Sequence, residues 1–185
     1  MPKVSESHRA GRRRQILAGA RRAFARHGYE GATVARLEQA TGLSRGAIFN
    51  YFPDKWSIFY ALAEEDTDRL GRLWLEEGYG SVLRRMARED PDWLGVYLEL
   101  VRKLGTEPEL REQWSQRSPE LSEEMKRRVE EMQQGHELRD DVDPEEIGRF
   151  LGLLLDGIAV QVTAGFPVGD VEPLLRLVSA AIAPQ

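Results

Sequence analysis

The stretch from Gly31 to Lys55, GATVARLEQATGLSRGAIFNYFPDK, constrains the fold more than any other part of the chain. Thr33 and Ser44 carry hydroxyls that can cap two short helices, and Gly42 stands where a tight turn needs a positive φ. The apolar residues that would hold the two helices together are Leu37, Ala40, Leu43, Ile48 and Phe52. This pattern is typical of a helix-turn-helix, which places its second helix in the major groove of DNA.

The same segment supplies candidates for contact with DNA. Arg45 can donate to guanine or to a phosphate, and Asn50 can read adenine or bind the backbone. Gly46 has no side chain to hold the helix away from the base edges. The hydroxyl and ammonium donors suited to phosphate oxygens are those of Thr33, Ser44, Tyr51 and Lys55. Phosphate contacts would fix the register on the duplex, and a few base contacts would give the sequence preference.

The alternative interpretation is a helical hairpin whose cations form a solvated face. The charge distribution favours the DNA hypothesis. Residues 1–55 contain eleven lysines and arginines and four acids, a net charge of +7, whereas the other 130 residues carry 15 cations and 27 acids, a net charge of −12. An acidic chain that keeps one basic end is expected of a polyanion-binding head on a body that stays off nucleic acid.

The run from Arg13 to Leu62 resembles the DNA-binding domain of TetR-type transcriptional regulators. The matching elements are HGYEGATV, ATGLSRGAIFNYF and the F-x-x-K that starts the next helix. The resemblance implies a homodimer that binds an inverted-repeat operator in double-stranded DNA, with a helical body that holds a small-molecule effector. The segments EGATVARLEQATGLSRGAIFNYF, ALAEED, LEL…TEPELREQW and ELRDDV…LLLDG are also similar to a group within this family, the aconitase repressors of actinobacteria. That similarity implies citrate as effector, with Mg²⁺ as a candidate companion, and the aconitase gene as a target.

Periodicity predicts an all-α fold, because apolar residues recur at helical spacing and no strand pattern is visible. We expect a flexible basic tail at 1–11, a three-helix DNA-binding domain at 12–54 whose first helix runs over 12–27, and a helical effector-binding and dimerisation domain at 55–185 that begins with a connecting helix at 55–75. Further helices are expected at 81–88, 92–104, 107–117, 119–134, from Asp143-Pro144 onward, and at 169–183.

The last two helices are apolar on more than one side, which predicts a second packing partner besides the rest of the body. A second copy of the chain is the simplest candidate, and one intramolecular core is the alternative. The residues assigned to this dimer interface are Phe150, Leu151, Leu154, Leu155, Ile158, Leu174 and Val178. Asp156, within LLLDGIAV, is predicted to be a buried ion-pair member, a pocket residue or a polar pin in the interface.

Converging cations in the body would suit a di- or tricarboxylate effector, because arginine can grip a carboxylate with two hydrogen bonds. A solvated face with pairs along one helix is the alternative for each of these residues. The candidates for the effector site are Trp93, Glu99, Arg102, Lys103, Arg127 and Arg128.

Several function classes are disfavoured by composition. The chain has no cysteine, its three histidines are isolated, and no nucleophile, phosphate-loop or dinucleotide motif is present, so we expect no enzyme activity, no metal site and no cofactor of its own. No apolar signal core and no stretch long enough to span a bilayer are visible, so we expect a cytoplasmic protein without a membrane partner. The competing hypothesis is a helical dimer that does not bind DNA and acts as a ligand-binding or scaffolding module.

Overall fold

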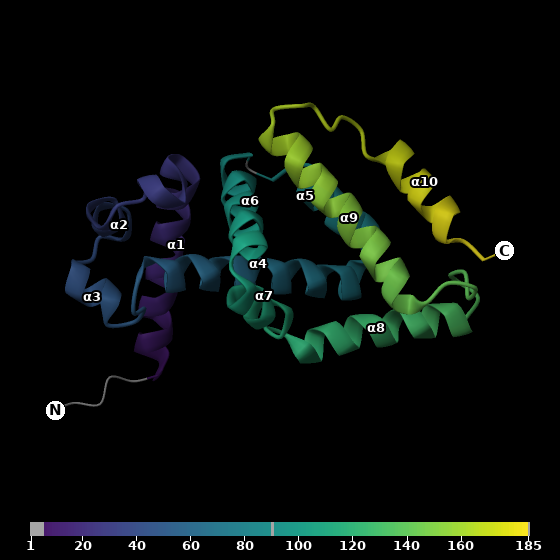
Figure 1. Cartoon of the computed structure of the whole chain (residues 1–185), viewed down its shortest axis with the longest axis horizontal. Helices are drawn as coiled ribbons and strands as arrows, with labels where there is room; N and C mark the ends of the chain where they lie inside the picture. The colour runs from purple at the N-terminus through teal and green to yellow at the C-terminus, as the bar shows by residue number, and fades with distance from the viewer. Residues whose placement is uncertain (1–5, 90, 185) are drawn as a thin grey trace.

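The computed structural model describes residues 6–89 and 91–184, and these form ten α-helices and no strand (Figure 1). This confirms the predicted all-α fold. The helices are α1 Glu6–Gly31, α2 Val34–Thr41, α3 Arg45–Phe49, α4 Lys55–Glu77, α5 Tyr79–Met86, α6 Pro91–Thr106, α7 Pro108–Ser115, α8 Pro119–Gln134, α9 Pro144–Thr163 and α10 Glu172–Ile182.

The first three helices form a small head around the start of α4. Ile16, Ala20 and Phe24 recur every four residues on α1 and are fully buried. They meet Leu37 of α2 and Ile48 of α3 in one apolar cluster. A short helix such as α3 has little stability of its own, so burial of Ile48 is what fixes its position on the head.

Helix α4 connects this head to the body (Figure 1). Asp54 caps its N-terminus and accepts a hydrogen bond from the backbone N–H of Ser57 at 2.7 Å. Its first turns bury Phe59 and Leu62 in the core of the head, and Gly71 further along packs against α8 at Leu121. One rigid element therefore belongs to both parts of the molecule.

The body consists of α5 to α10 and two further apolar clusters. Asp143 caps α9 by accepting a hydrogen bond from the N–H of Glu145 at 2.8 Å, with Pro144 in the first turn, as the sequence predicted. Helix α9 buries Ile147 and Leu151 in one cluster and Ile158 in the other. It is thus the central element of the body, with α10 beside its first half.

The first and third helices differ in length from the prediction. Glu6–Gly11, part of the predicted flexible tail, belong to α1, and residues 1–5 of that tail lie outside the described residues. The chain also continues in helical form past His27 to Gly31, across a kink at Gly28, whose φ is 66°. The predicted second helix of the turn motif is short, because α3 ends at Phe49.

Candidate nucleic-acid interface and effector cavity

The turn between α2 and α3 is built from the residues that the sequence indicated. Thr33 Oγ1 accepts a hydrogen bond from the N–H of Arg36 at 3.4 Å, and Ser44 Oγ accepts one from the N–H of Ala47 at 3.4 Å. Gly42 has a φ of 69° and donates to the carbonyl of Glu38 at 2.9 Å. Each helix end is capped locally, so the angle between the two helices is set by residues within the motif itself.

The outer face of α3 is open to solvent. Arg45, Gly46 and Asn50 are exposed, and a Cβ added to Gly46 would meet nothing within 4 Å. The backbone N–H of Arg45 donates to Glu38 Oε1 at 2.6 Å, which ties the start of α3 to α2. The guanidinium of Arg45 lies 5.9 Å from the centroid of the Phe49 ring. A rigid, uncrowded surface with one cation and one amide can therefore approach a groove of DNA.

Tyr51 and Lys55, the other predicted DNA contacts, are half-buried. Tyr51 packs on the core of the head. Lys55 Nζ donates to the carbonyl of Tyr29 at 2.8 Å and lies 4.2 Å from the centroid of the Tyr29 ring. Its side chain is 23% exposed. In the DNA-free structure this ammonium group thus holds the end of α1 against the start of α4, and its role at a phosphate stays a prediction.

A cavity of about 580 Å³ lies in the body between α4, α5, α6, α8 and α9. Its wall is largely apolar and includes Phe59, Trp74, Trp93 and Met125. Asp156 also lines it and accepts a hydrogen bond from the hydroxyl of Tyr97 at 3.2 Å. Asp156 is exposed, so the predicted buried ion pair is wrong, and its place in the cavity wall supports the pocket residue, while the interface pin stays a prediction. The size of the cavity suits a small molecule, and the charged side chains in its largely apolar wall would meet the polar groups of that molecule.

The predicted effector residues are not brought together around this cavity. Of the six, Trp93 lines it, whereas Glu99, Arg102, Lys103, Arg127 and Arg128 do not. Glu99 Oε2 accepts a hydrogen bond from the N–H of Tyr29 at 2.7 Å, and Lys103 Nζ lies 4.8 Å from the centroid of the Trp56 ring. These two side chains of α6 point toward the head. Arg102, Arg127 and Arg128 are exposed, and Arg128 pairs with Glu131 on the same helix at 3.7 Å.

Sequence reasoning missed Arg117, which does line the cavity. Its Nη1 donates to the carbonyl of Trp114 at 2.7 Å, and its guanidinium lies 4.0 Å from the centroid of that residue's ring. Its Nε is buried and has no hydrogen-bond partner among the described residues. Burial lowers the pKa of Arg117, although Asp68 and other nearby acids raise it. No periodicity marks this residue, because it lies in the short connection between α7 and α8.

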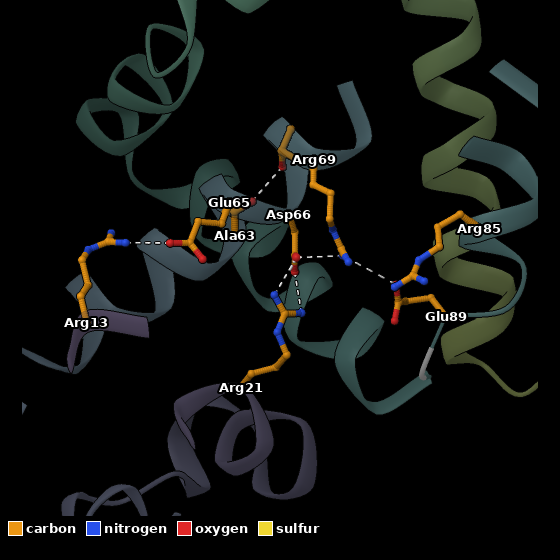
Figure 2. Close-up of polar contacts among 9 residues, drawn as sticks. Arg13, Arg21, Ala63, Glu65, Asp66, Arg69, Arg85 and Glu89 are labelled. Carbon is orange, nitrogen blue, oxygen red and sulfur yellow. Dashed lines mark hydrogen bonds and ion pairs between the residues drawn. The ribbon is translucent and has the colours of Figure 1, made fainter. Parts of the chain in front are cut away.

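An ion-pair network joins the head to the cavity wall (Figure 2). Asp66 of α4 accepts two hydrogen bonds from Arg21 of α1, at 2.6 and 2.8 Å, and a third from Arg69 at 3.0 Å. Arg69 lies 3.9 Å from Glu89, which pairs with Arg85 of α5 at 3.2 Å. Nothing in the sequence indicated this role for Asp66, since Arg21 belongs to another helix and lies 45 residues away in the chain.

The residues predicted for the dimer interface divide into two groups. Leu151, Ile158 and Val178 are buried within one chain, and Leu154, Leu155 and Leu174 are partly buried in its core clusters. Phe150 is 37% exposed. Sequence reasoning missed other apolar residues of α9 and α10, Leu153, Val160 and Leu177, which are 65%, 50% and 69% exposed. An apolar face thus extends over the last two helices.

A helix-turn-helix head with an exposed third helix, joined by one long helix to an all-α body with a cavity, defines the class of two-domain helix-turn-helix regulators. The model for bacterial regulatory proteins of the tetR family matches residues 16–62, and that for the C-terminal domain of BetI-type transcriptional repressors matches residues 82–185. The chain belongs to the TetR family.

Full-length relatives agree with this assignment. The chain is 45% identical over 184 residues to the HTH-type transcriptional repressor Rv1474c of Mycobacterium tuberculosis, covering 98% of each chain. It is 42% identical over 173 residues to the HTH-type transcriptional repressor AcnR of Corynebacterium glutamicum, covering 92% of each. Among solved structures, GusR of Salmonella enterica has the same fold, with a TM-score of 0.76 at 20% identity over 97% of this chain and 98% of that one. The resemblance to the aconitase-repressor group is thereby confirmed.

No helix in the described part of the chain combines the length and hydropathy needed to cross a bilayer.

Proposed function

We propose that this protein is a transcriptional repressor that binds double-stranded DNA as a homodimer and is released from it by a small-molecule effector. The observation that carries the proposal is the exposed face of α3 and its C-cap, where Arg45, Gly46 and Asn50 are presented by a helix that the buried Ile48 holds in place. The relatives that match over nearly the whole chain are named as repressors, which supports the direction of regulation.

The head residues divide into base-reading and phosphate-binding groups. Arg45 and Asn50 are exposed and carry the donors and acceptors that match base edges in the major groove. Thr33 and Ser44 stand at the N-termini of α2 and α3, where backbone N–H groups and hydroxyls favour phosphate. Tyr51, between α3 and α4, and Lys55, the first residue of α4, would add to phosphate binding. The reading head is thus small, and a second copy is needed to cover a full operator.

The exposed apolar face of α9 and α10 supplies the contact for that second copy. Exposed apolar side chains at Phe150, Leu153 and Leu177 would leave water on association. Gly157, between Leu153 and Val160 on one face of α9, is exposed and has nothing within 4 Å of a Cβ position, which allows close approach of a partner helix. A two-fold dimer presents two copies of α3 to successive major grooves, so the operator would be an inverted repeat.

The effector would occupy the cavity of the body, and we assign it to the carboxylates. Arg117 provides the wall with a cation that still has an unused N–H donor. Two other cations of the wall, Arg69 and Lys126, are engaged, with Asp66 at 3.0 Å and with Glu145 at 2.7 Å. Citrate is the candidate that follows from the relatives named AcnR, and the aconitase gene is the candidate target.

Mg²⁺ fits this site only as a companion of the effector. The residues that the structure describes contain no group of three or more His, Cys, Asp or Glu side chains able to hold a metal ion. Mg²⁺ usually keeps several of its water ligands and binds carboxylate oxygens. Waters and the carboxylates of citrate would therefore supply most of the ligands of the ion. The chain's own contribution would be the carboxylates of the wall, such as Asp156.

Selection of bound genomic fragments tests the proposal as a whole. The purified protein is mixed with sheared genomic DNA, bound fragments are sequenced, and the selection is repeated with citrate, citrate plus Mg²⁺ and succinate. We expect the bound fragments to share an inverted repeat, and we expect these fragments no longer to be recovered when the effector carboxylate is present. Recovery of fragments without any shared sequence would contradict DNA-specific binding and favour a ligand-binding or scaffolding dimer.

A further inference from the structure

The head shares its apolar core with α4 and with α6, where Val96 and Leu100 are buried against it, and a small set of polar contacts lies around this core. Arg13 pairs with Glu65 at 2.7 Å, and both side chains are nearly half exposed. Glu99 accepts a hydrogen bond from Tyr29, as described above. Arg21 makes a further polar contact, which reaches two different helices, α4 and α6.

Arg21 is held on both sides. Its guanidinium forms the two-pronged contact with the carboxylate of Asp66 on α4, at 2.6 and 2.8 Å. The same group lies 4.0 Å from the centroid of the Trp93 ring on α6. The exposed fractions of the Arg21 and Asp66 side chains are 33% and 14%. Planar stacking and a bidentate ion pair at a partly buried site fix the orientation of an arginine more strongly than an exposed pair does.

Both partners of Arg21 line the effector cavity, one from each of two helices. Asp66 belongs to the α4 wall and Trp93 to the α6 wall. Glu65 and Glu99, which make the other polar attachments to the head, do not line it. Among the polar contacts of the head, the one made by Arg21 therefore depends on the separation of α4 and α6 across the cavity, in addition to the apolar packing of α1 on both helices.

Asp66 also has a fixed position within the body. Arg69, which also lines the cavity, donates to Asp66 Oδ1, the same atom that accepts a hydrogen bond from Arg21. The side chain of Arg69 extends toward Glu89 and Arg85 (Figure 2). The carboxylate is thus anchored on the body side by Arg69 and on the head side by Arg21. A shift of the α4 wall changes the partner that Asp66 can reach.

We propose that Arg21 is the positioning residue through which the two cavity walls set the angle of the DNA-binding head. An occupant that moves Asp66 away from Trp93 breaks one of the two contacts of Arg21. The hydrogen bond from Tyr29 to Glu99, outside the cavity, and the apolar packing of α1 on Val96 and Leu100 of α6 remain, so the head tilts about these contacts. This inference deepens the proposed function, on which its regulatory meaning rests, but the geometry of the contact can be tested without DNA or effector.

The test measures the distance between head and body within one chain. The protein has no cysteine, so Gln39→Cys on α2 and Glu124→Cys on α8, both at exposed positions, give a clean pair of spin-label sites. Labelled protein is diluted with an excess of the unlabelled, cysteine-free chain, and electron–electron double resonance then reports pairs within one chain. Arg21→Gln and Asp66→Asn are compared with Glu65→Gln, the adjacent acid that pairs with Arg13 outside the cavity.

We expect Arg21→Gln and Asp66→Asn to shift or broaden the distance distribution, and Glu65→Gln to leave it unchanged. Arg21→Lys keeps the charge but loses the planar fork, and it should give an intermediate distribution. If only the positive charge of Arg21 mattered, Arg21→Lys would give the distribution of the parent protein. Distributions for Arg21→Gln and Asp66→Asn that match that of Glu65→Gln would overturn the inference. Circular dichroism checks that each variant is folded, and Trp93→Phe, which weakens the stacking contact while keeping an aromatic ring in the core of the head, replaces any variant that is not.

A second arm separates this inference from the proposed function. Citrate with Mg²⁺ is added to the labelled parent protein and to Asp66→Asn, and binding is followed independently by tryptophan fluorescence. Binding to both proteins with a distance change in the parent only supports the proposed coupling. A citrate-induced change of equal size in both proteins contradicts it. Absence of citrate binding to the parent would reject the assigned effector, while the ligand-free comparison still decides the role of Arg21.

Discussion

The carboxylate of Glu99 on α6 accepts a hydrogen bond from the backbone N–H of Tyr29, at 2.7 Å, directly after the bend of α1 at Gly28. The bend leaves backbone groups without helical partners, and a side chain of the body satisfies one of them. A Cβ at Gly28 would lie 3.1 Å from Glu99 Oε1, so the approach of the two segments is close. The end of α1 is therefore shaped by the effector-binding domain.

Replacement of Glu99 by alanine should destabilise the protein. The partly buried N–H of Tyr29 would lose a charged acceptor, which costs about 1–3 kcal/mol. Urea unfolding followed by circular dichroism measures the free energy of unfolding. Glu109→Ala, at an exposed position on α7, is the control and should change it little. Equal effects of the two substitutions would show that the contact contributes nothing measurable.

Close packing between α1 and α2 depends on Gly19. A Cβ at this position would lie 2.7 Å from the Cα of Thr41 and 2.8 Å from the carbonyl oxygen of Ala40, both backbone atoms. Gly19→Ala should therefore force the helices apart and destabilise the head by about 1–3 kcal/mol. Gly11→Ala, also in α1 but with nothing within 4 Å, should stabilise the protein by about 0.5–1 kcal/mol. Thermal unfolding of the two variants checks the opposite signs, and a neutral Gly19→Ala would contradict the close contact.

Charged substitutions on the exposed apolar face of α9 and α10 should prevent two chains from forming a dimer. Leu153→Glu combined with Leu177→Glu places two charges where apolar side chains are 65% and 69% exposed, and burial of unpaired charges disfavours a dimer. Sedimentation velocity should show a dimer for the parent and a monomer for the double variant. Val101→Glu, an exposed apolar position on α6, is the control and should remain dimeric. A parent that sediments as a monomer at all concentrations would refute the proposed interface.

Alkaline pH should destabilise the protein through its buried phenols. Burial raises the pKa of Tyr97 to about 12, with a further contribution from Asp156, and burial also raises the pKa of Tyr79 to about 12. The folded protein holds these protons more tightly than the unfolded chain, whose tyrosines have a pKa near 10. The free energy of unfolding should thus fall as the pH rises from about 10 to about 12, and Tyr97→Phe should weaken the fall. The same slope in Tyr97→Phe would exclude Tyr97 as a source.

The helix ends that are fixed by neighbouring residues could be predicted from the sequence. Thr33, Ser44 and Asp143 cap helices as predicted, because a cap involves residues two or three positions apart. The length of α1 could not be predicted in the same way. Gly28 is a typical helix terminator, but packing of Tyr29 against Phe24 and Phe59 and the hydrogen bond to Glu99 let the chain resume its helix beyond it.

The effector-site residues show the opposite limit of sequence reasoning. Lys103 was grouped with the other cations of the body because they share helices, yet it faces the ring of Trp56 in the head, since its orientation depends on which neighbour covers α6. Arg117, in the connection before α8, lines the cavity without any pattern to mark it. Asp66 likewise gained its role from Arg21, a partner 45 residues away in the chain.

Selective binding to DNA by α3 is tested most directly by fluorescence anisotropy with the selected operator and a scrambled duplex of equal length, over a range of salt concentrations. We predict that affinity for both falls with salt, that the operator is preferred by at least about 10³-fold, and that Arg45→Ala removes much of this preference while Lys55→Ala weakens binding to both duplexes. Equal affinity of the parent protein for the two duplexes at every salt concentration would contradict a sequence-reading role for the head.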